Sequence, residues 1–242
     1  MSGHSHFATI KHKKGLADAQ RSKAFSKLAK EITIAAKAGP DPASNASLRT
    51  ILEKAKALNM PSDNVERAIK KATGAGDANE LQEILLEAYG PGGIALLIAG
   101  ITDNKNRTLG EIKLILSKFG GKMVEGGAVQ WLFERKGTIT ILRGEKTKEE
   151  LELIAIEAGA EDLRWQDENT LTIFTKSIEL EHVKKKLIDM PLPLEDSSLD
   201  WIAKEYVEAP ENVQASTEKL FEVLDEQDDV QEIYSNLKIS NS

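Results

Sequence analysis

Residues 138–188 read TITILRGEKTKEELELIAIEAGAEDLRWQDENTLTIFTKSIELEHVKKKLI. Short runs rich in β-branched and apolar residues alternate here with longer runs of helical periodicity. Thr147 and Glu150 have the spacing of a capping box at the start of the first helix, and Gly159 ends that helix. With one more strand downstream, the order is β-α-β-β-α-β, which predicts a ferredoxin-like fold for residues 136–205. The expected elements are, in order, 138–142, 147–158, 162–165, 170–175, 178–188 and a strand within 194–207.

The segments on either side of residues 136–205 complement each other. Upstream, residues 89–93 read YGPGG and have the composition of a hairpin turn between two strands. Compared with a complete ferredoxin-like fold, the upstream segment lacks one helix–strand pair. The downstream segment supplies that pair, and its helix begins at Pro210. We therefore predict a second ferredoxin-like α/β domain, formed by residues 79–135 plus 206–239, into which the first is inserted. Its expected elements are strands 84–89, 94–101, 129–133 and 230–234, a helix over 109–119 and the helix from 210.

Residues 1–76 have the periodicity of helices only. Phe25, Leu28 and Ile32 form an apolar stripe on the first helix, and the lysines of that helix lie on the opposite side, facing outward. The chain is thus predicted to be an α+β multidomain protein, in which an N-terminal three-helix domain is followed by two ferredoxin-like α/β domains, the last one inserted into the middle one. The helices are expected over 17–38, over 45–58 and from Pro61 or Asp63 to Thr73, and the outward-facing lysines are Lys23, Lys27, Lys30 and Lys37.

The composition restricts the class of protein. Cysteine is absent from the 242 residues, which excludes disulfides, thiolate zinc sites and cysteine nucleophiles. No apolar run approaches the ~20 residues of a membrane span, and the N-terminus has no apolar segment typical of a signal peptide. The hydrophobic content of 40% is that of a folded chain. We expect a cytoplasmic protein without a membrane partner.

The net charge of −7 conceals a strong asymmetry. Residues 1–76 contain 14 of the 32 basic and 6 of the 39 acidic residues, a charge of +8, so the remainder carries −15. This contrast favours one basic binding module attached to an acidic body. The alternative is an ordinary lysine-rich helical surface.

The basic character is strongest near the N-terminus, where residues 3–14 read GHSHFATIKHKK. Three of the four His residues lie in this arm, and Phe7 could stack on an unpaired base. Lys and Arg that contact phosphates release counterions, so the composition suits a polyanion. A solvated terminal segment is the alternative. The predicted nucleic-acid-binding residues are His4, His6, Lys11, His12, Lys13, Lys14, Arg21, Lys23, Lys27 and Lys30.

Catalytic motifs are absent from the sequence. It contains neither a G-x-x-x-x-G-K-[ST] phosphate loop nor an H-E-x-x-H metal motif, and the glycine pairs are typical of turns. Only His182 remains outside the arm for acid–base chemistry by His. We expect no enzyme, no cofactor and no metal site. Trp131, Trp165 and Trp201 are expected to be buried, Trp131 within the strand over 129–133.

Several motifs together resemble those of the YebC/PmpR family over essentially the whole chain. They are GHS (3–5), IKHKK (10–14), NMP (59–61), IKK (69–71), YGPGG (89–93), TDNKNRT (102–108) and GAVQWLFE (127–134). The resemblance implies one helical and two α/β domains and a DNA-binding transcriptional regulator. It also implies a link to translation, because a mitochondrial relative activates translation of cytochrome c oxidase and bacterial members are associated with the ribosome. Many relatives have Lys-Trp where this chain has His6-Phe7, which removes a fixed cation and a larger ring.

Two functions therefore stay open at this point. One is a DNA-binding regulator of transcription. The other is a translation factor whose basic arm contacts ribosomal RNA, which the many lysines fit slightly better because Lys suits phosphates rather than base edges. Both assign a nucleic-acid partner to residues 1–76.

Overall fold

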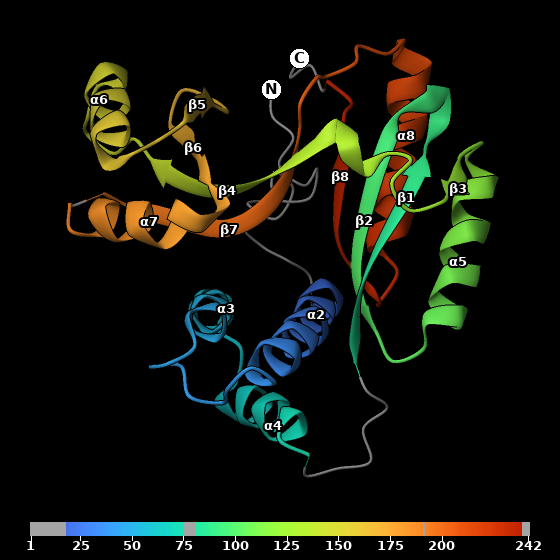
Figure 1. Ribbon diagram of the computed structural model, residues 1–242, viewed down its shortest axis with the longest axis horizontal. Coiled ribbons are helices and arrows are strands. Elements are labelled where there is room, and N and C mark those ends of the chain that lie inside the picture. The colour runs from blue at the N-terminus through green and yellow to red at the C-terminus, as the bar shows by residue number, and fades with distance from the viewer. Residues whose placement is uncertain (1–17, 75–80, 191, 239–242) are drawn as a thin grey trace.

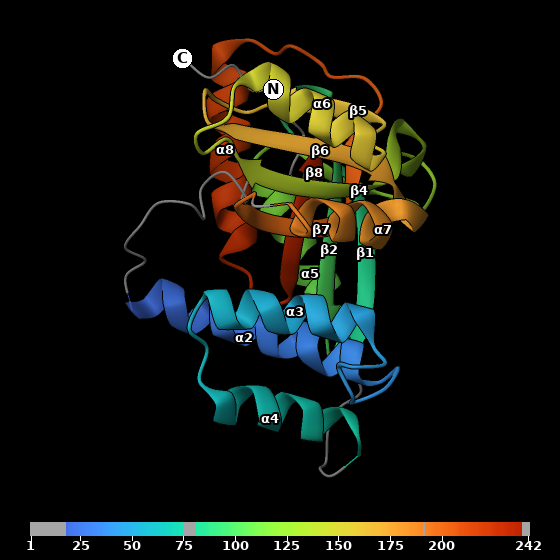
Figure 2. The ribbon, with the colours of Figure 1, turned by 90° about the vertical axis from the view of Figure 1, so that its left-hand side faces the viewer.

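The computed structural model describes residues 18–74, 81–190 and 192–238. Three helices come first and two antiparallel sheets of four strands each follow, so the predicted α+β fold is confirmed. The helical unit lies below the two α/β layers in Figure 1, and Figure 2 shows α2 and α3 directly beneath the second sheet. No helix within these ranges is long and apolar enough to cross a bilayer.

The helical unit consists of α2 (Asp18–Ala36), α3 (Ala46–Ala57) and α4 (Ser62–Ala72). Its core contains the predicted stripe, with Leu28 and Ile32 packed against Leu48. Asn45 caps α3 through its side-chain oxygen, which accepts from the Leu48 N–H at 3.0 Å. Its amide nitrogen donates to the carbonyl of Ala35, so one residue joins the end of α2 to the start of α3.

The first α/β layer is a sheet in the order β3-β1-β2-β8. Its strands are β1 (Gln82–Tyr89), β2 (Ala95–Thr102), β3 (Lys122–Val124) and β8 (Val230–Ser235). One face is covered by α5 (Lys105–Lys118) and α8 (Glu211–Asp225), which pack on the apolar residues of the sheet. The predicted hairpin is present, with the 3-10 turn η1 (Pro91–Gly93) between β1 and β2. The C-terminal strand β8 pairs with β2, so strands from before and after residues 136–205 lie in one sheet.

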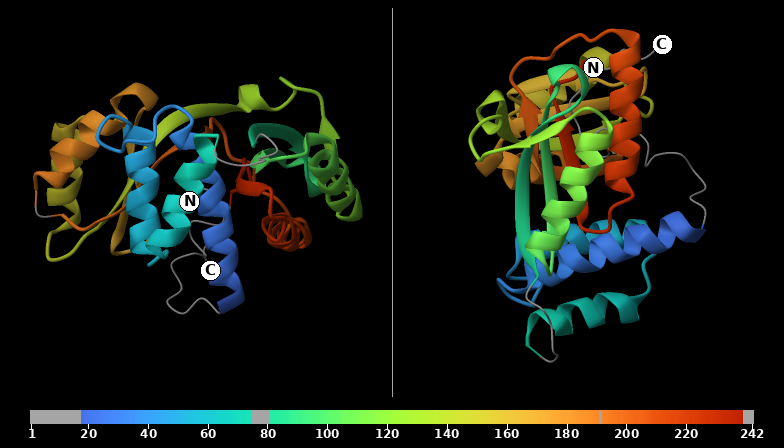
Figure 3. Two further views of the ribbon diagram at one scale, coloured as in Figure 1. Left: turned by 90° about the horizontal axis from the view of Figure 1, so that it is seen from below. Right: turned by 90° about the vertical axis from the view of Figure 1, so that its right-hand side faces the viewer.

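The second α/β layer has the order β5-β6-β4-β7, which is the ferredoxin-like arrangement. Its strands are β4 (Phe133–Leu142), β5 (Asp162–Trp165), β6 (Thr170–Lys176) and β7 (Leu194–Ala203). The helices α6 (Lys148–Ala158) and α7 (Leu180–Ile188), with the short turn η3 (Ser177–Glu179) before α7, cover one face. The predicted capping box is formed, because Thr147 and Glu150 each bond the other's backbone N–H. In the view from below in Figure 3, the helical unit lies nearest the viewer, with one α/β layer on either side behind it.

The segment before β4 differs from the prediction. The strand expected over 129–133 is instead the 3-10 turn η2 (Gln130–Leu132), and Trp131 is 63% exposed, so its predicted burial is wrong. The cause is Glu87, a buried residue of β1. Its carboxylate accepts the backbone N–H groups of Val129 at 2.6 Å and Gln130 at 2.9 Å, which folds this segment into a turn.

Candidate nucleic-acid interface

The predicted binding residues fall into two groups. His4, His6, Lys11, His12, Lys13 and Lys14 lie outside the described residues. Arg21, Lys23, Lys27 and Lys30 lie on α2, where Arg21 is exposed. Their contact with nucleic acid stays a prediction, but the structure shows what the α2 side chains touch within the chain.

Lys23, Lys27 and Lys30 form a lysine row on α2. The sequence predicts that this row faces solvent, but in the structure it packs against acidic residues. Lys27 is 7% exposed, and its ammonium group lies 2.6 Å from Oδ1 of Asp225 and 3.1 Å from the Asp225 carbonyl oxygen. Asp225 is the last residue of α8, so the basic face of α2 packs on the C-terminal end of that helix. Lys23 extends the contact with an ion pair of 3.2 Å to Glu226. The periodicity of α2 places the row away from its own core but cannot reveal a second, acidic neighbour.

Lys30 joins this contact through a buried carboxylate. Its Nζ donates to Oδ1 of Asp229 at 2.7 Å and to the carbonyl oxygen of Asp228 at 2.8 Å. The other oxygen of Asp229 accepts from Thr108 at 2.6 Å and from Arg107 at 2.8 Å. Burial by itself raises the pKa of Asp229, but the hydrogen bonds from Lys30, Thr108 and Arg107 outweigh burial and hold it well below its usual range. The residues 225–229 therefore form an acidic turn that binds the lysine row.

A second surface of the helical unit is open and basic. A groove of about 440 Å³ runs between α2 and α4. Among the described residues that line it, the charged ones are Lys30, Arg67 and Lys71, and none is a carboxylate. Arg67 and Lys71 are exposed and make no ion pair with any residue in the described ranges. They are one helical turn apart on α4, so both can contact the same polyanion.

Polar and aromatic groups complete this groove. The hydroxyl groups of Ser22 and Ser26 and the amide of Asn64 line it and can donate hydrogen bonds to phosphate oxygens. Phe25, a half-buried residue of the predicted stripe, also reaches the groove. Sequence reasoning missed Arg67 and Lys71. The available signal was their i, i+4 spacing on the helix, whereas the pairing of α2 with α4 is visible only in three dimensions.

The described residues offer little for other kinds of site. Within the described ranges there is no group of three or more His, Asp or Glu side chains that could hold a metal ion. Two cations near tryptophans are already engaged in cation–π contacts within the chain. Lys148 lies 5.1 Å from the Trp165 ring centroid, and Arg135 lies 5.3 Å from that of Trp201. The α2–α4 groove is therefore the strongest candidate in the helical unit for binding a polyanion.

Comparisons with known proteins agree with this architecture. The family described as "TACO1/YebC protein N-terminal domain" matches residues 5–75, and "TACO1/YebC second and third domain" matches residues 81–237. A relative from Pelodictyon phaeoclathratiforme is 45% identical over 243 residues, covering 100% of this chain and 97% of the relative. One from Desulfitobacterium hafniense is 41% identical over 246 residues, with the same coverage. Both are named "Probable transcriptional regulatory protein".

A solved structure shares the whole fold. The crystal structure of a conserved hypothetical protein from Aquifex aeolicus superimposes with a TM-score of 0.90 at 42% sequence identity, and 98% of each chain is covered. The agreement includes the helical part and both α/β layers, because so little of either chain is left out. On the family matches, the sequence identities and this shared fold, the chain belongs to the TACO1/YebC family.

Proposed function

We propose that the protein is a non-enzymatic, DNA-binding regulator of transcription in the cytoplasm, and that the helical unit carries the binding surface. The observation that supports this most directly is the α2–α4 groove, in which the described lining residues include three cations and no carboxylate. The names of the relatives point to the same class of function. The N-terminal arm, with His4, His6, Lys11, His12, Lys13 and Lys14, immediately precedes α2 and is proposed to extend this surface.

The lysine row of α2 has a different role in this proposal. Lys23, Lys27 and Lys30 already neutralise the acidic turn 225–229. Most of the phosphate contacts are therefore assigned to the arm, Arg21, Arg67 and Lys71. The contribution of Lys30 is shared, because its side chain also lines the groove.

A second function rests on the chemistry of the same groove. Among the described lining residues, two of the three cations are lysines and Asn64 is the only carboxamide, so the groove offers more contacts to phosphates than to base edges. Such a surface binds without strong sequence preference, which suits a translation factor that contacts ribosomal RNA. Crosslinking the full-length protein in cells separates the two functions. Recovery of genomic DNA supports the transcriptional role, and recovery of ribosomal RNA supports the translational one.

A matched pair of variants tests the groove itself. Arg67→Gln combined with Lys71→Gln should weaken binding to any nucleic acid and reduce the slope of log K against log salt by about 0.9 for each lost duplex phosphate contact. Lys105→Gln combined with Lys113→Gln changes the net charge equally on exposed positions of α5, and should leave binding unchanged. If both double variants lose affinity equally, the attraction is a property of net charge and the groove is not the site.

A further inference from the structure

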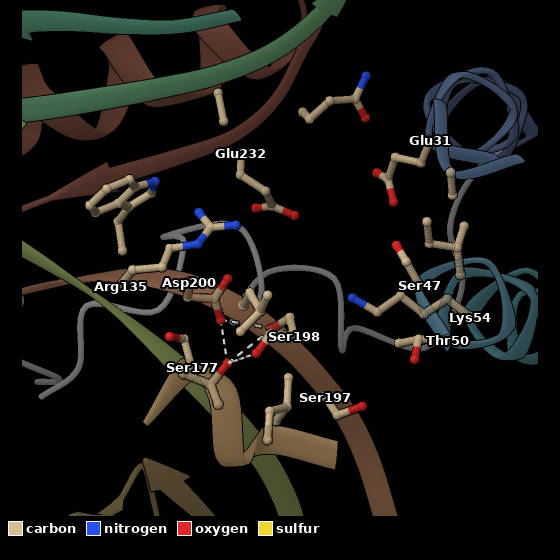
Figure 4. Close-up of a pocket in the computed structure, with 18 of the residues that line it drawn as sticks. Glu31, Ser47, Thr50, Lys54, Arg135, Ser177, Ser197, Ser198, Asp200 and Glu232 are labelled. Atoms are coloured by element: carbon tan, nitrogen blue, oxygen red, sulfur yellow. Dashed lines mark hydrogen bonds between the residues drawn. The ribbon is translucent and has the colours of Figure 1, made fainter. Parts of the chain in front are cut away.

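A large cavity lies where the helical unit and both α/β layers meet (Figure 4). Its volume is about 790 Å³, and its wall includes residues of α2 and α3, of β7 and η3, and of β1, β2 and β8. Carboxylates outnumber cations in this wall by six to two. The carboxylates are Glu31, Glu83, Glu181, Asp196, Asp200 and Glu232, and the cations are Lys54 and Arg135.

The cavity already stabilises one ammonium group. Lys54 extends into it from α3, and its Nζ lies 3.2 Å from Oδ1 of Asp196 on β7. Burial by itself lowers the pKa of Lys54, but the surrounding negative charge outweighs burial and raises the pKa well above its ordinary value. The carboxylates responsible are Asp196, Glu31, Glu232 and Asp200. The potential inside the cavity therefore favours positive charge.

Two neighbouring residues of β8 have polar atoms without partners among the described residues. Gln231 lines the cavity and is 8% exposed, and neither its Oε1 nor its Nε2 has a hydrogen-bond partner within the described ranges. Such unsatisfied buried groups are rare in native proteins because each one costs free energy. The carboxylate of Glu232 likewise makes no hydrogen bond or ion pair with a residue that the structure describes. The wall thus has hydrogen-bonding capacity that the described part of the chain does not use.

The spacing of the carboxylates decides the type of cation. Glu31 lies on α2, Asp200 on β7 and Glu232 on β8, and no three acidic side chains in the described part of the chain converge on one point as metal ligands. Apolar side chains also line the wall, among them Ile34 and Ile51. Separated charges on a wall that also has apolar surface match an extended chain of methylene groups with several ammonium groups, rather than a compact metal ion.

We propose that this cavity is a binding site for an aliphatic polyamine. Its ammonium groups pair with carboxylates from all three units, and its methylene segments lie against Ile34 and Ile51. The side-chain oxygen of Gln231 accepts a hydrogen bond from the ligand. Because the ligand touches all three units at once, binding also stabilises their arrangement. This inference does not depend on nucleic-acid binding.

The test is a titration of spermidine into the full-length protein, without nucleic acid, followed by calorimetry and by the emission of Trp201, which lines the cavity. We expect saturable binding at one site. Glu31→Gln combined with Glu232→Gln should weaken it by about tenfold or more, because two charge-assisted contacts are lost. Glu157→Gln combined with Glu222→Gln is the control, since both residues are exposed, lie outside the cavity wall and change the net charge equally.

A third variant gives a change of the opposite sign. Lys54→Gln removes the resident ammonium group and should strengthen spermidine binding, which mere damage to the fold cannot do. Circular dichroism and thermal unfolding establish that each variant is folded. The proposal is overturned if the wild-type protein shows no saturable binding, if the control pair loses as much affinity as the Glu31 and Glu232 pair, or if Lys54→Gln binds more weakly.

Discussion

The contact between the lysine row and the acidic turn 225–229 leads to a quantitative prediction for Lys27→Met. The substitution keeps most of the aliphatic part of the side chain but removes the ammonium group. That group makes two charge-assisted contacts to Asp225, at 2.6 Å and 3.1 Å, and the side chain of Asp225 is only 19% exposed. Without Lys27, the carboxylate of Asp225 stays partly buried without this partner, beside the C-terminal carbonyl groups of α8.

The magnitude follows from burial. Hydrogen bonds to charged groups contribute about 1.5–3 kcal/mol each, and breaking a fully buried ion pair costs about 3–5 kcal/mol. Asp225 regains some hydration, so we expect Lys27→Met to destabilise the docking of α2 by about 2–4 kcal/mol. Lys23→Met is the matched control on the same helix face. Its partner Glu226 is 78% exposed, so that loss should be less than about 1 kcal/mol.

Hydrogen exchange of the α2 amides measures this difference directly. A loss of 2 kcal/mol accelerates exchange through local opening by about 30-fold, and the control should stay within about fivefold of the wild type. Equal exchange in the two variants would show that burial of the Lys27 pair does not determine the stability of this interface.

Three further predictions concern the first α/β layer. Glu87→Gln should loosen the turn around Trp131, seen as a lower steady-state anisotropy of its emission in a variant whose other tryptophans are replaced. Burial by itself raises the pKa of Glu87, but the hydrogen bonds from the backbone N–H groups outweigh burial, so the net pKa is lowered. The stabilisation of the turn by the Glu87 carboxylate is therefore present above the ordinary pKa of about 4.3 and should fade as the pH falls below that value. Asp229→Asn should lower the thermal midpoint at pH 7, and the difference from the wild type should shrink in acid, because the depressed pKa of Asp229 makes its contribution disappear only as the pH falls through the folded-state value. Gly92→Ala should destabilise the hairpin by more than about 1 kcal/mol in urea unfolding, since φ is +65° there and a Cβ would lie 2.7 Å from Val213; an unchanged midpoint would show that the turn can shift.

Much of the fold was predictable because its signals are local. The capping box of Thr147 and Glu150 and the alternating runs on either side fix the β-α-β-β-α-β order within short windows of sequence. The hairpin turn at 89–93 likewise identifies β1 and β2. Hydrophobic periodicity reports whether a segment has one apolar face, and that is sufficient to find most of the helices and strands, but not the short strand β3. The two mistakes at η2 arose from Glu87, which lies more than forty residues earlier in the chain and captures backbone groups that a strand would need.

The sequence by itself determined the basic and acidic parts of the chain, most of the helices and strands, and the family to which the chain belongs. Only the tertiary structure decided where the charges act. Lys27 and Asp225 are 198 residues apart, and no local pattern indicates that a row of lysines will meet the end of α8 instead of phosphate. The same holds for the α2–α4 groove and for the central cavity. Both are formed by side chains from separate elements, and a charge pattern along one helix gives the direction of a side chain but not the identity of its neighbour.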